Sequence, residues 1–144
     1  MLTIRLARLD EREALEALQW RASLALEEHR EQLEANPDAI ELPIAMIERD
    51  EVFVAELDGR VVGFTVLFNG EVEAELDGLF VEPGHWRTGI GSALVDVATH
   101  EARKNGLTLM VIANPSAQQF YEKCGFVMEG ETQTRFGPAL RMSK

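Results

Sequence analysis

Two glycines separated by one residue, Gly89 and Gly91, stand where this 144-residue chain is best suited to bind a ligand. They follow the apolar run Leu79–Val81 and precede an apolar stripe at helical spacing, so the predicted order is strand, turn and helix start. The first backbone N–H groups of a helix have no acceptor inside the helix, and the helix dipole is positive there. Because glycines let a ligand approach the backbone closely, this segment predicts a pyrophosphate site.

Two other glycine motifs that bind phosphates do not fit this segment. A Gly-x-Gly-x-x-Gly motif would need glycine at position 94, which holds Leu94. A P-loop needs lysine before its Ser or Thr, whereas Ser92 directly follows Gly91. Alone, the glycine pair indicates only that something anionic binds at a helix start.

The strand before the glycines changes its pattern near its end. Its acidic residues alternate with apolar ones, which gives one acidic and one apolar face. At Gly78 the alternation stops, and a glycine at such a break is typical of a β-bulge, which leaves backbone groups free for a ligand. Four acids in alternation also fit a solvated sheet face. The acids are Glu71, Glu73, Glu75 and Asp77.

Two motifs in this order carry a family resemblance. The first is Val81-x-Pro83 followed by Gly89-Ile90-Gly91, and the second is the segment Asn114–Phe126, which reads NPSAQQFYEKCGF. With them the chain resembles the GNAT superfamily of N-acetyltransferases, well over roughly residues 50–130 and more loosely before. The family commonly has Arg or Gln where this chain has Trp86. Arg87 follows at a place where glycine is frequent, and whether Arg87 takes over the side-chain contact stays open.

The resemblance implies acetyl-CoA as the acyl donor. It implies that the pantetheine arm pairs with a splayed strand end, and that the pyrophosphate lies on the backbone amides of the glycine segment. Asn114 would contact the pantetheine or cap the following helix, with Pro115 as its first residue. The implied donor-binding residues are Leu79, Phe80, Val81, Arg87, Thr88, Gly89, Ile90, Gly91, Ser92 and Asn114.

The resemblance also implies two catalytic side chains. Transfer to an amine requires the ammonium to lose a proton, and the leaving thiolate benefits from gaining one. Tyr121 occupies the place of the family's acid, although packing in an apolar stripe is an alternative. Glu75 occupies the place of a carboxylate base, with Asp77 or a water relay as alternatives. Cys124 has no nearby histidine in the sequence, so we expect direct transfer without an acetyl-cysteine.

The predicted function is therefore acetyl-CoA-dependent N-acetyl transfer to a primary amine of a small molecule or peptide. The alternative is a non-catalytic acyl-CoA-binding domain. Family position makes Trp20, Arg21 and Ser23 candidates for the acceptor site, and dimers are frequent in the family, so a homodimer is a further expectation.

The amino-acid composition limits which ligands and which cellular compartment we expect for this chain. With 25 Asp and Glu against 14 Lys and Arg, the net charge of −11 disfavours nucleic acid and favours a cationic amine, although acidic surfaces also simply keep proteins soluble. One cysteine and three separated histidines predict neither a disulfide framework nor a metal site. No apolar stretch is long enough to span a membrane, and acids interrupt the start where a signal peptide would be apolar, so we expect a cytoplasmic protein.

The periodicities predict a single domain over residues 1–144 with an α/β fold. After a strand at Thr3–Leu6, a helix should start near Asp10 and Glu13 and fade near His29, and another should cover about 38–49. An antiparallel meander is expected next, then a strand–helix–strand crossover, all in one mixed sheet flanked by helices; the resemblance adds splayed central strands. The later expected elements are strands at Val52–Leu57, Arg60–Phe68, Glu71–Val81 and Leu107–Ala113, helices with stripes at Ile90–Ala98 and Ala117–Cys124, a left-handed cap at Gly125, and short strands at Phe126–Val127 and Leu140–Met142.

Overall fold

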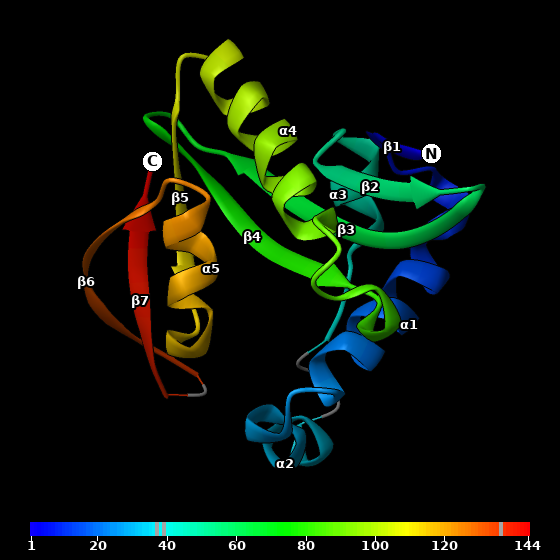
Figure 1. Cartoon of the computed structure of the whole chain (residues 1–144), viewed down its shortest axis with the longest axis horizontal. Coiled ribbons are helices and arrows are strands. Elements are labelled where there is room, and N and C mark those ends of the chain that lie inside the picture. The colour runs from blue at the N-terminus through cyan, green and yellow to red at the C-terminus, as the bar shows by residue number, and fades with distance from the viewer. Residues whose placement is uncertain (37, 39, 136) are drawn as a thin grey trace.

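The computed structural model describes residues 1–36, 38, 40–135 and 137–144, and these residues form one sheet of seven strands in the order β1-β2-β3-β4-β5-β7-β6 (Figure 1). The strands are β1 (Leu2–Leu6), β2 (Val52–Leu57), β3 (Arg60–Asn69), β4 (Glu73–Val81), β5 (Thr108–Ala113), β6 (Val127–Thr134) and β7 (Gly137–Ser143). The helices are α1 (Arg12–Leu24), α2 (Glu27–Ala35), α3 (Ile44–Glu48), α4 (Ile90–Lys104) and α5 (Gln118–Lys123), with 3-10 turns at Leu9–Glu11, Pro83–His85 and Pro115–Ala117.

The mixed α/β sheet confirms the predicted fold class. Strands β1 to β4 are antiparallel, β4 and β5 are parallel across α4, and β7 and β6 are antiparallel again. The hairpin between β2 and β3 turns at Asp58-Gly59, where both residues have positive φ, as a tight primed turn requires. β4 begins at Glu73, two residues later than predicted.

Helices cover both faces of the sheet (Figure 1). α1 and α3 bury one face, in a core that contains Leu15, Ile47 and Val54. α4 and α5 bury the other face, in a core that contains Val95 and Tyr121. Because both faces are covered, β2 and β3 read as nearly continuous apolar runs instead of alternating ones.

β4 has a bulge and then leaves its parallel neighbour. Thr65 pairs with Leu79 and Leu67 with Leu76, so β4 has one residue more than β3 in this interval, at Asp77-Gly78. Among the described residues, β4 pairs with β5 only over Glu73–Leu76. Beyond this seam β5 continues with β7, and the two central strands diverge. The predicted bulge at Gly78 and the predicted splay are both confirmed.

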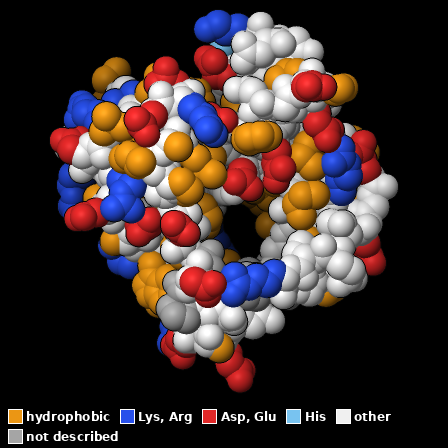
Figure 2. All heavy atoms as spheres, turned by 180° about the vertical axis from the view of Figure 1, so that it is seen from behind, with side chains coloured by type: hydrophobic (Ala, Val, Ile, Leu, Met, Phe, Trp, Pro, Cys, Tyr) orange, Lys and Arg blue, Asp and Glu red, His pale blue; other side chains and the backbone are white. Residues whose placement is uncertain are grey.

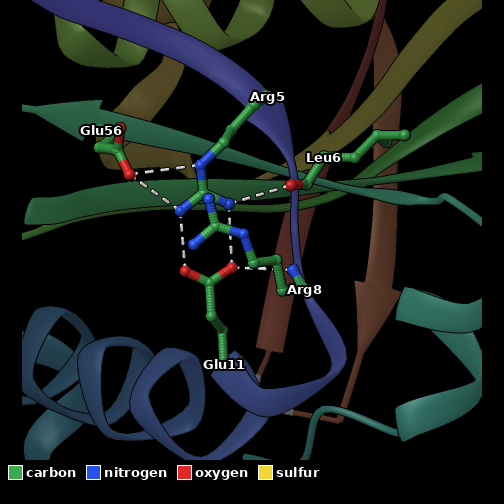
Figure 3. Close-up of polar contacts among 5 residues, drawn as sticks. All are labelled: Arg5, Leu6, Arg8, Glu11 and Glu56. Carbon is green, nitrogen blue, oxygen red and sulfur yellow. Dashed lines mark hydrogen bonds and ion pairs between the residues drawn. The ribbon is translucent and has the colours of Figure 1, made fainter. Parts of the chain in front are cut away.

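Arg5 on β1 determines how the first helix begins (Figure 3). Its guanidinium donates to both carboxylate oxygens of Glu11, at 3.0 and 2.8 Å, and to Glu56 on β2. Glu11 in turn accepts from the backbone N–H of Arg8 at 2.8 Å. The predicted cap by Asp10 and Glu13 is wrong, because this network draws Glu11 into the capping position and α1 starts at Arg12, after a 3-10 turn.

The remaining N-terminal helices also differ from the prediction. α1 ends at Leu24, and a separate helix, α2, continues to Ala35. α2 is polar on most sides, so its sequence carries no stripe that would have revealed it. The predicted helix over 38–49 reduces to α3, which starts after Pro43; residue 39 of that range lies outside the described residues.

The C-terminal hairpin is longer than predicted. β6 covers eight residues and β7 seven, although the sequence pattern indicated only a few residues of each. β6 is an edge strand with mostly exposed side chains, so it shows little apolar alternation. The described helices include none with the length and apolarity that a membrane crossing requires.

Candidate active site

A cavity of about 880 Å³ lies at the splay between β4 and β5. Its wall comes from β4 and the end of β5, from the loop and first turn of α4, and from α1 and α5. The molecule is hollowed between its two halves, and acidic and hydrophobic side chains gather along this hollow (Figure 2). The splay is therefore what opens the site.

The segment from Arg87 to Ser92, here called the amide loop, presents a row of free donors. Within the described chain, none of its six backbone N–H groups donates to a protein acceptor, and the first such bond of α4 runs from Ala93 to Gly89 at 3.1 Å. Gly89 has φ +88°, a left-handed conformation that strains any other residue, and a Cβ there would meet open space. These amides at the positive end of a fifteen-residue helix can bind an anion.

Gly89 and Gly91 are required for different structural reasons. Gly91 lies against α5, because a Cβ on it would come within 3.1 Å of Cζ of Phe120. Gly91 therefore permits close packing of α5, whereas Gly89 permits the turn. Arg87 has φ +64° in the position where the family often has glycine, and a non-glycine residue there costs about 1–2 kcal/mol.

Trp86 binds the end of β4. Its indole Nε1–H donates to the carbonyl of Val81 at 2.8 Å, and the ring, 40% exposed, lines the cavity. The N–H of Glu82 donates to Val62 on the β3 side, so the backbone groups of Val81 and Leu79 point to the opposite side, toward the splay. Beyond the seam, β4 thus presents an open edge, whose last carbonyl is taken by Trp86.

Tyr121 reaches the cavity from α5. It is only 7% exposed and packs edge-to-face on Phe120 and Phe126, with ring centroids 5.1 and 5.3 Å apart. Its hydroxyl makes no hydrogen bond to a described residue, and no fully buried polar side-chain atom of the described chain lacks a partner, so the hydroxyl faces the cavity. Burial raises the pKa of this phenol above its ordinary value of 10, so it stays protonated at neutral pH.

Glu75 and Asp77 line the same cavity, and their side chains lie within hydrogen-bonding reach of each other. Burial raises the pKa of Glu75, and the charge and hydrogen bond of Asp77 raise it further, followed by the charge of Glu73. Arg141 lowers it. Burial also raises the pKa of Asp77, although its side chain is open to the cavity, because the hollow surrounds it with protein.

Asn114 and Cys124 have structural roles. The side-chain oxygen of Asn114 accepts from the N–H of Ser116 at 2.9 Å, so Asn114 caps the Pro115–Ala117 turn while it also lines the cavity. Cys124 lies half-buried beside Ser92, at 3.9 Å between sulfur and oxygen. Burial raises the pKa of its thiol, which disfavours the thiolate that a nucleophile needs.

The cavity brings together nearly all the residues that the sequence predicted. Thr88 alone is absent from its wall, and its hydroxyl donates to the carbonyl of His85. Of the acceptor-site candidates, Ser23 lines the cavity, but Trp20 does not, and Arg21 forms a bidentate ion pair with Glu82 at 2.7 and 2.8 Å. The predicted site residues in the wall are Glu75, Leu79, Phe80, Val81, Arg87, Gly89, Ile90, Gly91, Ser92, Asn114 and Tyr121.

Two contacts at the site were not predicted. Thr65, wholly buried on β3, donates its hydroxyl to the carbonyl of Gly78 at the bulge. Trp86 bonds Val81, as described above. A threonine inside an apolar strand opposite the predicted bulge was a usable signal for the first contact; no sequence pattern indicates the second. In the described chain, no group of three His, Cys, Asp or Glu side chains could hold a metal ion.

Comparisons with known proteins agree with this geometry. The profile of the acetyltransferase (GNAT) family matches residues 12–126. An uncharacterized N-acetyltransferase of Mycobacterium tuberculosis (strain H37Rv) is 33% identical over 94 residues, which cover 62% of this chain and 60% of that protein. An uncharacterized N-acetyltransferase of Methanocaldococcus jannaschii is 34% identical over 94 residues, covering 56% of this chain and 42% of that protein. The matches thus span less than two thirds of these relatives.

Solved structures share the fold over nearly the whole chain. The PaiA N-acetyltransferase of Thermoplasma acidophilum, in complex with coenzyme A, has a TM-score of 0.79 at 22% identity and covers 100% of this chain and 99% of that one. The ribosomal-protein-S18-alanine N-acetyltransferase of Escherichia coli has a TM-score of 0.73 at 22% identity, covering 99% and 92%. Since the family profile matches most of the chain and the fold agrees, the chain belongs to the acetyltransferase (GNAT) family.

Proposed function

We propose that this protein is an acetyl-CoA-dependent N-acetyltransferase that moves the acetyl group by direct transfer to a primary amine of a small molecule or peptide. The observation that carries the proposal is the row of six backbone N–H groups of the amide loop, at the N-terminus of α4, that have no acceptor among the described residues. Such a row matches the pyrophosphate of coenzyme A. The fold relative from T. acidophilum is itself solved with coenzyme A.

The open edge of β4 suits the rest of the donor. Leu79 and Val81 direct backbone groups into the cavity, and an extended amide chain can add to such an edge by β-type hydrogen bonds. We assign Leu79, Phe80 and Val81 to the pantetheine arm and residues 87–92 to the pyrophosphate. Asn114 borders the same space, so a pantetheine contact from its amide is compatible with its cap.

Two side chains supply the proton transfers. Acetyl transfer forms a C–N bond, breaks the C–S bond, takes a proton from the ammonium and gives one to the sulfur. Glu75, with its raised pKa, is the proposed base. Tyr121, protonated and without a partner among the described residues, is the proposed acid. The half-buried Cys124 takes no part, which is why we propose direct transfer.

The resemblance also implies that one domain over residues 1–144 carries the activity and that two copies associate. Sedimentation velocity over a range of protein concentrations tests the homodimer. The cytoplasm remains our prediction for the compartment.

A thiol-release assay with acetyl-CoA and a panel of amines tests the activity. We expect coenzyme A to raise the melting temperature and acetyl-CoA to release thiol only when an acceptor is present. Stabilisation without thiol release for any amine would instead identify a non-catalytic acyl-CoA-binding domain. Stabilisation by ATP in preference to coenzyme A would refute the proposal.

A matched pair of variants tests the amide loop. Ser92→Pro removes one of the six N–H groups within the first helical turn, where proline is tolerated, and Ser92→Ala retains it. We expect weaker coenzyme A binding for the proline variant alone, with both variants folded by circular dichroism. Equal affinities would show that this amide does not contact the donor.

A further inference from the structure

The cavity contains a pair of carboxylates, Glu75 and Asp77, here called the acid pair. Asp77 belongs to the bulge between Leu76 and Leu79, two residues after Glu75, and both carboxylates line the cavity. Thr65 fixes the bulge by donating to the carbonyl of Gly78. The backbone therefore holds both carboxylates on the cavity wall, within reach of each other.

The acid pair lies at the far end of the cavity from the amide loop. The seven residues from Glu75 to Val81 have six rises between them and extend at most about 20 Å, and the amide loop begins at Arg87, after the Pro83–His85 turn. A donor bound on the loop and on the open edge of β4 would thus direct its reactive end toward the acid pair. The cavity wall also includes the uncharged residues Ala22, Ser23 and Leu26 of the α1 region.

A second, independent feature marks the cavity as a ligand site. Tyr121 is nine-tenths buried, lines the same cavity, and has a hydroxyl without a hydrogen-bond partner among the described residues. The side chain is buried except where its hydroxyl opens to the cavity, so water or a ligand in the cavity must supply the hydrogen bond of this hydroxyl. The space between Tyr121 and the acid pair is therefore suited to a polar guest.

Among the described residues, no cation in the cavity wall offsets the acid pair. The wall's basic side chains, Arg87 and His85, belong to the loop region after β4. Arg141 on β7 acts on Glu75 from outside the wall, and its donors are engaged with Glu73 at 2.6 Å and Glu129 at 3.0 Å. A cationic ligand therefore complements the charge of the acid pair.

We propose that Glu75 and Asp77 together receive the acceptor's ammonium group, so that the site takes primary amines without a carboxylate near the amine. This inference rests on the acetyl transfer proposed above and narrows its substrate class. Asp77 is then a recognition residue for the acceptor, beside Glu75 as the base. A carboxylate on the acceptor would be repelled by two like charges in a partly desolvated site, and Arg141, the cation that acts on Glu75, lies outside the wall and is engaged with Glu73 and Glu129.

The titration behaviour of the acid pair supports this assignment. Burial and mutual charge raise the pKa of Glu75, and burial raises that of Asp77, so the pair binds its first proton more readily than isolated carboxyls do. Glu73 adds to this shift and Arg141 opposes it. A bound ammonium favours the ionised pair, so the acceptor KM should fall as pH rises through the pKa values of the pair.

Matched acceptors test the substrate class. The panel pairs 1,4-diaminobutane with 4-aminobutanoate, and glycinamide with glycine, which differ within each pair by a carboxylate. We expect kcat/KM at least tenfold higher for the carboxylate-free member of every pair that turns over. Equal or better use of the amino acids would overturn the proposal. Failure of both carboxylate-free amines, while another amine releases thiol, would also overturn it and leave acetyl transfer intact.

Variants test the residues. Asp77→Asn should raise the acceptor KM at least tenfold, change kcat less, and reduce the discrimination within each acceptor pair. The control, Glu71→Gln, removes one exposed negative charge just before β4, outside the cavity wall, and should leave both values unchanged. Equal effects of the two variants would show that the overall negative field acts and not the acid pair. Retained stabilisation by coenzyme A in both variants separates these outcomes from failure of the donor site.

Discussion

The hydroxyl of Thr65 on β3 donates to the carbonyl of Gly78 on β4, at the extra residue that turns β4 toward the cavity. Thr65 has no exposed surface, so if its hydroxyl is removed, no water can take its place as the donor to the carbonyl of Gly78. Thr65→Val keeps the shape and removes the hydrogen bond, and we expect a loss of about 1–3 kcal/mol in the free energy of unfolding. Urea denaturation measures it.

Thr65→Ser is the matched control for that variant. It keeps the hydroxyl and loses one methyl group, at a cost of about 1 kcal/mol. We expect Thr65→Val to lower kcat/KM as well, because the bulge positions Asp77, whereas Thr65→Ser should be close to wild type. A valine variant with unchanged stability and activity would show that the bulge does not depend on this bond.

Gly91 should not tolerate a side chain while Phe120 is present. A Cβ would lie 3.1 Å from the ring, so Gly91→Ala requires the Phe120 ring to shift by a few tenths of an ångström, and Phe120→Leu should relieve this contact. A double-mutant cycle measured by urea denaturation should give a coupling of about 0.5–3 kcal/mol. The double variant should lose less stability than the sum of the losses in the two single variants. Gly84→Ala is the control, since a Cβ there meets nothing within 4 Å and should change stability little. Additive effects of the Gly91 and Phe120 changes would refute the steric explanation.

Tyr121→Phe should reduce turnover without loss of stability. The variant lacks the proposed acid, so we expect kcat to fall about 10²–10⁴-fold, with coenzyme A affinity unchanged. Stability should stay equal or rise, because the lost hydroxyl has no partner among the described residues. Since burial raises the pKa of this phenol, Tyr121 should cause no decline in kcat as pH approaches 10. An undiminished kcat would remove Tyr121 from the chemistry.

Glu11 should make folding stability depend on acid pH. The hydrogen bond from Arg5 is the main reason that the pKa of Glu11 lies below its ordinary value of 4.5. A carboxyl with a lowered folded pKa stabilises the protein above its unfolded pKa, and this contribution is lost as pH falls through the folded value. We expect Glu11→Gln to cost about 1–3 kcal/mol at pH 7 and progressively less below about pH 4.5, measured by urea denaturation.

Glu13→Gln, in the first turn of α1 at an exposed position, is the control for Glu11→Gln and should have little effect at either pH. A penalty for Glu11→Gln that stays constant from pH 7 to pH 3 would show that shape, and not charge, is what Glu11 contributes.

The central part of the fold could be predicted because local chemistry determines it. The turn at Asp58-Gly59 and the loss of alternation at Gly78 are short-range signals, and the structure has a turn and a bulge at these places. α2 and β6 carried no such signal, because few of their described side chains are buried. Their structure depends on neighbours that are distant in sequence.

In the site, too, some features follow from the local sequence and others from the packing of distant elements. The amide loop was predictable because a helix start and two glycines define it without help from the rest of the chain. The Trp86 bond to Val81 and the Arg21–Glu82 ion pair depend on how the end of β4 is placed against the following loop and α1. Tyr121 could be named from its motif, but its free hydroxyl appears only once α5 is packed.

The seam between β4 and β5 joins only four residues of each strand. Because α4 connects these two parallel strands, the seam can form only after α4 has packed on the sheet. The hairpins of β2 to β4 and of β6 with β7 need only short loops, so during folding they should form well before the seam. The cavity would then be completed in the final step of folding, and it would be the first feature lost when the protein begins to unfold.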